Sequence, residues 1–341
     1  MTQTAPDAAA LHAATLTLDS HIDIPWPQGP SPFEDGQRRV DLPKMRRGGV
    51  SAGCFVAYLP QARRDAASHD AAFARAEAML EAIRGMAQDR PGIAARITET
   101  ADAVEQAHAD GVLAIIPAVE NGFAMGTDIA RLRAFRGRGA RYLTLTHNGH
   151  NALADSAIPR PDLGDAAEEH GGLSALGRAA IGELNRLGML VDVSHASVAA
   201  MRQAVEVSRS PIVASHSSIH ALCPHPRNLT DAQLDLLRDS GGLVQITAVS
   251  AFLRKSAAPD AVTVGDFIDH LDYAVQRIGI AHVGISSDFD GGGGFAGWHD
   301  AGESANLTAE LLRRGYGAAD IAALWSGNFL RLLRQAEALA A

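Results

Sequence analysis

The chain has 341 residues, of which 47% are hydrophobic and 20% charged, a composition typical of globular proteins that bury a large core. Its formal net charge of −9 argues against nucleic acid or an anionic membrane as the main partner. No apolar run approaches the ~20 residues of a membrane span, and two cysteines, Cys54 and Cys223, are too few for a disulfide framework.

The first predicted element is the apolar, β-branched run that begins at Leu16 and leads into the sequence DSHIDIPW. We expect a strand that Pro25 closes. Residues i and i+2 of an extended chain point to the same side, so His21 and Asp23 should leave the strand end together, and such a pair can chelate a divalent metal. Alternatively, Asp23 only orients a buried His21 at a strand-end turn. Ligands from other strands must decide between these alternatives.

Seven further short apolar runs follow along the chain. Runs that are apolar throughout, rather than alternating, are typical of parallel strands buried on both faces. Eight strand–helix units predict a single (β/α)8 TIM barrel domain over residues 1–341, with helices at its C-terminal end. An open doubly wound sheet is disfavoured because no GxGxxG motif follows the first strand. The further predicted strands are Val50–Tyr58, Val112–Val119, Arg141–Thr146, Met189–Ser194, Pro211–Ser215, Leu243–Ala248 and His282–Ser287.

Helical patterns and polar loops separate the predicted strands. Two long polar segments, Pro27–Arg47 and Asn148–Gly171, are predicted to be loops, and loops of this length in compact domains tend to be functional. Apolar residues at helical spacing predict the remaining connections to be helices. These helices are Ala66–Asp89, Thr100–Ala109, Thr127–Phe135, Ser174–Leu187, Ser197–Ser208, one capped near Thr230, Val264–Ile278, and those from Leu307 to Ala338.

Imidazole and carboxylate groups recur where the predicted strands end. In a barrel these ends face one mouth, so residues distant in sequence would meet there. Any one of them alone could be structural, and Asp288, which precedes the glycines of SDFDGGGG, could be a turn former. Jointly they exceed the ligand set of one tetrahedral zinc, which predicts two metals sharing a carboxylate. The strand-end residues are His21, Asp23, Glu120, His147, His195, His216 and Asp288.

Six motifs, in this order, resemble those of the membrane (renal) dipeptidases, peptidase family M19, which are zinc enzymes of the amidohydrolase-like superfamily. The motifs are DSHIDIPW, PAVENG, YLTLTH, VDVSH, SHSSIHALCPHPRNLTD and GISSDFDG. The resemblance implies two Zn2+ ions per chain, the first held by His21 and Asp23 and the second by His195 and His216. Glu120 and a water or hydroxide would bridge the two ions.

The same resemblance implies roles for three residues in substrate binding and catalysis. His147 would bind the substrate and polarise the scissile carbonyl, and Arg227 would take the terminal carboxylate, a task suited to a guanidinium fork. Asp288 would accept a proton from the attacking water and pass it to the leaving amine. The expected activity is hydrolysis of dipeptides that carry a free C-terminal carboxylate, including those with a D-residue at that position. The resemblance also implies a homodimer.

Some features depart from the family or leave other functions open. The mammalian members look secreted, disulfide-linked and lipid-anchored, whereas this N-terminus has no basic region followed by an apolar stretch, so we expect a cytoplasmic protein. Another amidohydrolase acting on a small or cyclic amide is the alternative; such relatives usually begin with HxH and often use a carboxylated lysine at strand four, where this chain has HxD and His147. A non-catalytic scaffold would be expected to have lost a ligand, and all five are present.

Overall fold

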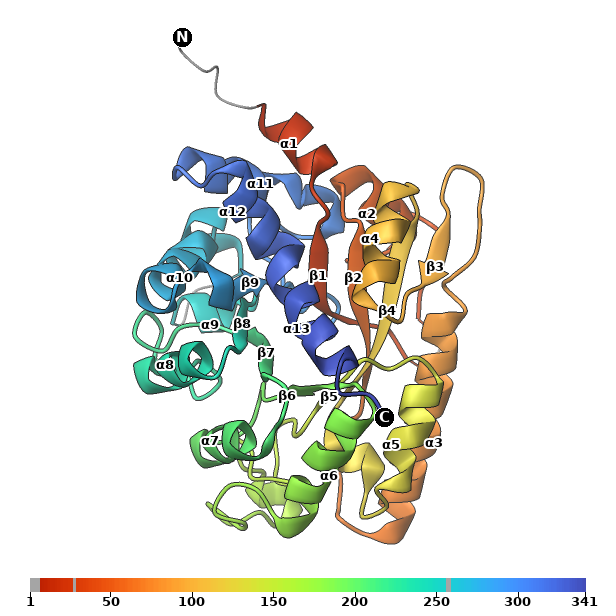
Figure 1. Ribbon diagram of the computed structural model, residues 1–341, viewed down its shortest axis with the longest axis vertical. Helices are drawn as coiled ribbons and strands as arrows, with labels where there is room; N and C mark the ends of the chain where they lie inside the picture. The colour runs from red at the N-terminus through yellow and green to blue at the C-terminus, as the bar shows by residue number, and fades with distance from the viewer. Residues whose placement is uncertain (1–6, 27–28, 256–258) are drawn as a thin grey trace.

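Eight parallel strands form a barrel that helices surround as a single domain in the computed structural model, which describes residues 7–26, 29–255 and 259–341 (Figure 1). The strand order is β1-β2-β4-β5-β6-β7-β8-β9, and β3 pairs with β4 outside this path. The (β/α)8 prediction is therefore confirmed. The strands are β1 (Leu18–Asp23), β2 (Ala52–Tyr58), β3 (Ala95–Ile97), β4 (Leu113–Glu120), β5 (Tyr142–Thr144), β6 (Leu190–Asp192), β7 (Val213–Ser217), β8 (Leu243–Ile246) and β9 (Val283–Ile285).

The first and last strands close the barrel through the residues that follow β9. Ile22 of β1 forms a parallel bridge with Phe289. The Asp23 N–H donates to the Phe289 carbonyl at 2.9 Å, and the Asp288 N–H donates to the His21 carbonyl at 3.0 Å. This closure places the turn after β9 directly beside the HxD pair.

Helices cover the outside of the barrel, and many begin at a side chain that caps them. Thr230 and Gln233 form a capping box at α8, and Thr263 and Asp266 form another at α10, so that free backbone N–H groups of the first turn are satisfied. The helices are α1 (Ala8–Ala14), α2 (Leu42–Gly48), α3 (Ala66–Arg84), α4 (Ala101–Ala109), α5 (Ala130–Gly137), α6 (Ala175–Arg186), α7 (Val198–Val207), α8 (Asp231–Asp239), α9 (Ser250–Leu253), α10 (Val264–Ile278), α11 (Ala305–Arg313), α12 (Ala318–Ala322) and α13 (Asn328–Glu337).

Helix α13 closes the barrel end at which the strands begin (Figure 1). Its Phe329 and Leu332 belong to one buried cluster with the first residues of β1, β6 and β8, which are Leu18, Leu190 and Leu243. Because this end is filled with apolar side chains, polar chemistry is left to the opposite mouth, where the strands end and where barrel enzymes place their active sites.

A buried histidine of α10 fixes the loop that follows β7. The Ile219 N–H donates to His270 Nδ1 at 3.0 Å, so Nε2 carries the ring proton and donates to the Leu253 carbonyl at 3.0 Å. Burial lowers the pKa of this imidazole, although the bond to the carbonyl opposes the shift. The neutral ring thus anchors the start of the segment that carries Arg227.

All eight predicted barrel strands overlap observed ones, whereas four short helices and strands were not predicted: α1, α2, α9 and β3. The predicted loop Pro27–Arg47 is wrong at its end, because Asp41 caps α2 and Pro43 occupies its first turn. Residues 27 and 28 of that loop, and residues 1–6 of the expected leaderless N-terminus, lie outside the described residues. Among the helices described, none combines the length and apolar character needed to cross a membrane.

Candidate active site

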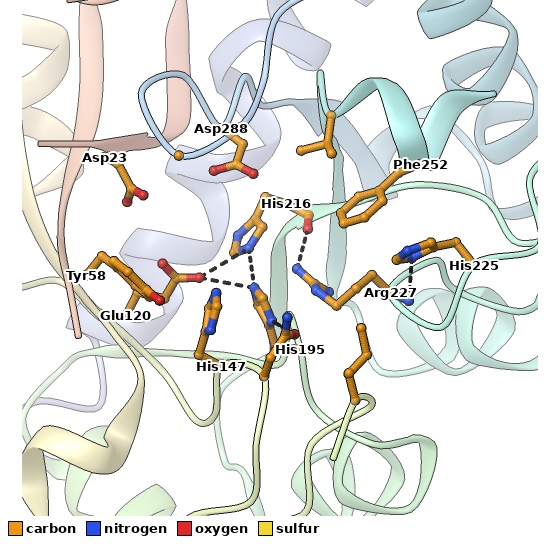
Figure 2. A pocket seen from close by; sticks show the side chains of 15 residues that line it. Asp23, Tyr58, Glu120, His147, His195, His216, His225, Arg227, Phe252 and Asp288 are labelled. Atoms are coloured by element: carbon orange, nitrogen blue, oxygen red, sulfur yellow. Dashed lines mark hydrogen bonds and ion pairs between the residues drawn. The ribbon is translucent and has the colours of Figure 1, made fainter. Parts of the chain in front are cut away.

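The residues predicted to form the site come together at the mouth where the strands end. They surround a cavity of about 390 Å3, into which their side chains point (Figure 2). His21 lies beneath the cavity and is fully buried. The predicted residues that line the cavity are Asp23, Glu120, His147, His195, His216, Arg227 and Asp288.

Glu120, the last residue of β4, stands between two groups of side chains. Its Oε1 lies 3.2 Å from His195 Nε2 and 3.3 Å from His216 Nε2. Its Oε2 lies 3.6 Å from His21 Nε2, which is in turn 3.8 Å from Asp23 Oδ1. Each carboxylate oxygen therefore faces a different pair of ligand-type atoms, as a bridging carboxylate would.

The donor atoms fit divalent metal ions better than they fit one another. His21 Nε2 and Asp23 Oδ1 are buried and have no hydrogen-bond partner in the part of the chain that the structure describes, and His195 Nε2 lies 3.0 Å from His216 Nε2. The separations resemble the ligand–ligand edges of roughly 3.3–3.6 Å expected when ligands lie ~2.0–2.2 Å from a tetrahedral zinc. Burial lowers the pKa of His21, but Glu120 and Asp23 outweigh it and raise that pKa to about 10, so the pocket favours positive charge.

Several residues at the mouth of the barrel have a strained backbone conformation. Four non-glycine residues have φ in the left-handed region: Asn121 at 83°, His195 at 66°, Asp288 at 56° and Asp290 at 64°. All four follow strand ends at the mouth, and two of them are predicted site residues. Such conformations cost about 1–3 kcal/mol each and cluster at functional sites.

Asp288 lies in a tight turn that needs glycine. Its carbonyl accepts N–H groups from Gly291, Gly292 and Gly293, so this glycine run is a closely bonded turn. A Cβ at Gly291 would lie 2.4 Å from Asp288 Oδ1 and 2.5 Å from Asp23 Oδ2. Burial raises the pKa of the Asp288 carboxyl to about 7, with Glu120 also raising it and His21 and Arg227 opposing. A carboxyl with this pKa can exchange a proton near neutral pH.

His147 faces the cavity between two aromatic rings. Its ring centroid lies 4.8 Å from that of Tyr58 and 4.1 Å from that of His195. Burial lowers the pKa of His147, so its imidazole is neutral at pH 7 and can donate one hydrogen bond into the cavity. Burial, Glu120 and Asp23 raise the pKa of Tyr58 to about 12, which keeps its hydroxyl protonated.

Arg227 supplies positive charge on the side of the cavity away from Asp23 (Figure 2). Its guanidinium is buried, and Nη2 donates to the His216 carbonyl at 3.2 Å. The guanidinium carbon lies 5.5 Å from the ring centroid of Phe252, and the Arg227 N–H donates to His225 Nδ1 at 3.1 Å. An anion can bind the remaining N–H groups beside this apolar wall.

Five lining residues were not predicted from the sequence: Tyr58, Asn148, Ile158, Val249 and Phe252. Tyr58 ends β2 in the same way as the predicted ligands end their strands, so position alone could have found it. Asn148 follows His147 and places its Oδ1 3.0 Å from His195 Nδ1. Phe252 follows β8 in α9, and no sequence motif marks it.

Comparison with known proteins gives consistent matches. The family model described as membrane dipeptidase (peptidase family M19) matches residues 6–341. Dipeptidase aclJ of Aspergillus oryzae is 34% identical over 306 residues, which cover 89% of this chain and 71% of that protein. The crystal structure of the probable dipeptidase PvdM from Pseudomonas aeruginosa has a TM-score of 0.92 and 32% identity, covering 98% of both chains. A metallopeptidase from Rhodobacter sphaeroides, liganded with a phosphinate mimic of L-Ala-D-Ala, has a TM-score of 0.80 and 29% identity, covering 94% of this chain and 99% of that one.

Proposed function

The chain belongs to the membrane dipeptidase family, peptidase family M19, and from this premise we propose that it is a binuclear zinc dipeptidase acting on dipeptides with a free C-terminal carboxylate. That it is a metal-dependent dipeptidase follows from the family; the proposal adds the zinc, its stoichiometry and the residue roles. The observation that carries this addition is Glu120, whose two oxygens face separate pairs of ligand-type atoms.

We assign His21 and Asp23 to one zinc ion, His195 and His216 to the other, and Glu120 to both. Bound zinc ions would supply Lewis acidity at the scissile carbonyl and lower the pKa of a water molecule towards ~7. The chain itself holds the five donor side chains in place, and the buried carboxylate of Glu120 can bind both ions.

Asp288 is proposed to move the proton. Its raised pKa, about 7, lets its carboxylate take a proton from the attacking water and its carboxylic acid give that proton to the leaving amine. The left-handed backbone at Asp288 and the glycine turn behind it hold the carboxylate over Asp23 and the proposed metal ligands.

His147 and Arg227 are proposed to bind the substrate. The neutral His147 would donate a hydrogen bond to the scissile carbonyl oxygen as negative charge develops on that oxygen. Stabilising this charge is usually the largest single contribution to catalysis. Arg227, buried on the side of the cavity away from Asp23, would neutralise the C-terminal carboxylate. A required contact with the C-terminal carboxylate would limit the enzyme to short peptides, and the mimic bound by the Rhodobacter sphaeroides relative supports acceptance of a D-residue at the C-terminal position.

Metal analysis combined with a substrate panel tests the proposal. Purified protein should contain two zinc equivalents per chain, hydrolyse L-L, L-Gly and L-D dipeptides, and lose activity to a chelator. C-terminally amidated dipeptides and cyclic amides are the controls, and we expect little turnover of either. Hydrolysis of cyclic amides with dipeptides left intact would favour the other amidohydrolase function, and one metal per chain would remove the bridging role of Glu120.

Compartment and assembly complete the proposal. We place the enzyme in the cytoplasm because both cysteines, Cys54 and Cys223, are buried free thiols. The homodimer rests on the family resemblance, and light scattering of the purified protein would test it.

A further inference from the structure

A buried hydrogen-bond network lies under the proposed metal ligands. Asp192 ends β6, and its Oδ2 accepts from Ser215 Oγ and from Thr144 Oγ1, each at 2.6 Å. Its Oδ1 accepts from the backbone N–H groups of Ser194 at 3.0 Å and Ser215 at 2.9 Å. Both carboxylate oxygens are thus fully engaged in a site with no solvent exposure.

The network fixes the proton on His216. Ser215 Oγ lies 2.9 Å from His216 Nδ1. A serine hydroxyl has one proton, and Ser215 donates it to Asp192, so Oγ can only accept from the imidazole. His216 therefore carries its proton on Nδ1, and the lone pair of Nε2 faces Glu120, 3.3 Å away. That is the tautomer a metal ligand requires at Nε2.

The two other histidine ligands receive weaker support of the same kind. His21 Nδ1 lies 2.9 Å from the hydroxyl of Tyr142, which donates onward to the Ser20 carbonyl at 2.9 Å. His195 Nδ1 lies 3.0 Å from an amide oxygen, that of Asn148. Ser215 Oγ also lies 3.3 Å from His21 Nδ1, a longer contact than the 2.9 Å to His216, so His216 has the stronger link to the carboxylate of Asp192.

Asp192 is not itself placed to be a ligand. One carboxylate oxygen of Asp192 and one ring nitrogen each of His21 and His216 lie within 4.8 Å of one another. However, four hydrogen bonds already occupy the Asp192 oxygens, and the Nε2 atoms of both histidines face Glu120 instead. Asp192 can reach a metal only through Ser215 and the imidazole.

From this geometry we infer that Asp192 and Ser215 are positioning residues that hold His216 in its metal-binding tautomer and increase the affinity of the ion it binds. The inference rests on the proposed metal centre. The buried charge of Asp192 orients the Ser215 hydroxyl, and that hydroxyl stabilises the Nδ1–H group and leaves more electron density on Nε2. Loss of such supporting partners typically weakens metal affinity by 10–100-fold.

The test is zinc affinity, measured by competition with a chromophoric chelator. Ser215→Ala should weaken the zinc site assigned to His216 by 10–100-fold and the site assigned to His21 less. Asp192→Asn should weaken the site assigned to His216 further although it is isosteric, because the backbone N–H groups hold the amide oxygen at the Oδ1 position. The amide NH2 would then face Ser215 Oγ and push the serine proton towards His216 Nδ1. The visible spectrum of the Co2+-loaded variants should change more at the ion assigned to His216 than at the ion assigned to His21, because Ser215 Oγ lies closer to His216.

Ser217→Ala is the matched control. Ser217 lies on the same strand, and its buried hydroxyl has no hydrogen-bond partner within residues 7–26, 29–255 and 259–341, so zinc affinity should not change. Thermal unfolding of the metal-free proteins identifies any variant that fails to fold. If Asp192→Asn does not fold, the zinc affinity of Ser215→Ala decides the test. Unchanged zinc affinity in a folded Ser215→Ala variant would overturn the inference and leave the dipeptidase proposal standing. A wild-type chain that binds no zinc would overturn both.

Discussion

Replacement of Arg227 by methionine tests the proposed carboxylate site. Arg227 is 3% exposed, and one guanidinium N–H already donates to the His216 carbonyl at 3.2 Å. Nε has no acceptor among the described residues, so the remaining N–H groups can make two charge-assisted bonds to a substrate carboxylate. Each such bond contributes about 1.5–3 kcal/mol. We therefore expect Arg227→Met to lower kcat/KM by roughly 100-fold or more, since 1.36 kcal/mol corresponds to a factor of ten.

The assay compares a dipeptide with its C-terminal amide in wild type and variant. The wild-type enzyme should lose about as much on the amide as the variant loses on the acid, and the two losses should not add, because both remove one interaction. Zinc content should stay unchanged, and Arg227→Lys should recover part of the rate. If Arg227→Met keeps the full preference for the free acid, the carboxylate binds elsewhere and this assignment is refuted.

Three further predictions concern proton transfer, the glycine turn and stability. Asp288→Asn should lower kcat by ~10²–10⁴-fold with two zinc ions still bound; unchanged turnover would exclude the proton role. Gly291→Ala should inactivate the enzyme, because the added Cβ would lie 2.4 Å from an Asp288 carboxylate oxygen. Gly182→Ala is the control, because nothing lies within 4 Å of its added Cβ on helix α6. Equal activities of the two variants would contradict the proposed need for glycine in the turn at Asp288. His270 has a folded-state pKa below its usual 6.5, so it stabilises the fold above that pH and loses its contribution as the pH falls through and below 6.5. In urea titrations, the wild type should lose up to ~1.4 kcal/mol more unfolding free energy per pH unit in that range than His270→Gln; parallel curves would refute this.

The barrel and the meeting of the strand-end residues at one mouth were predictable because both depend on local sequence. Each strand is a short apolar run, and a residue such as Glu120 or His195 directly follows or ends its run. Once the runs are counted, the barrel topology brings those ends together without further information. The HxD motif adds the one pair of site residues, His21 and Asp23, that are separated by a single residue in the sequence.

The rest depends on contacts between distant residues. In the sequence Asp192 is an ordinary strand residue, and its hydrogen bond with Ser215 of the next strand can be seen only in the structure. Phe252 reaches the cavity through a short helix after β8 that no periodicity announces. Helix α2 was predicted to be part of a loop because its seven residues show too little helical periodicity, and the glycines and prolines before it favour a loop.

The left-handed residues around the mouth have a consequence for engineering. Glycine at His195 or Asp288 would relieve a conformation that side chains disfavour, whereas at Asn121 or Asp290 it would also remove hydrogen bonds to backbone groups. The first two replacements would favour the folded backbone, yet they would delete the groups assigned to the chemistry. Selection for thermal stability alone would therefore favour inactive variants. A screen for stable variants should measure turnover together with the melting temperature.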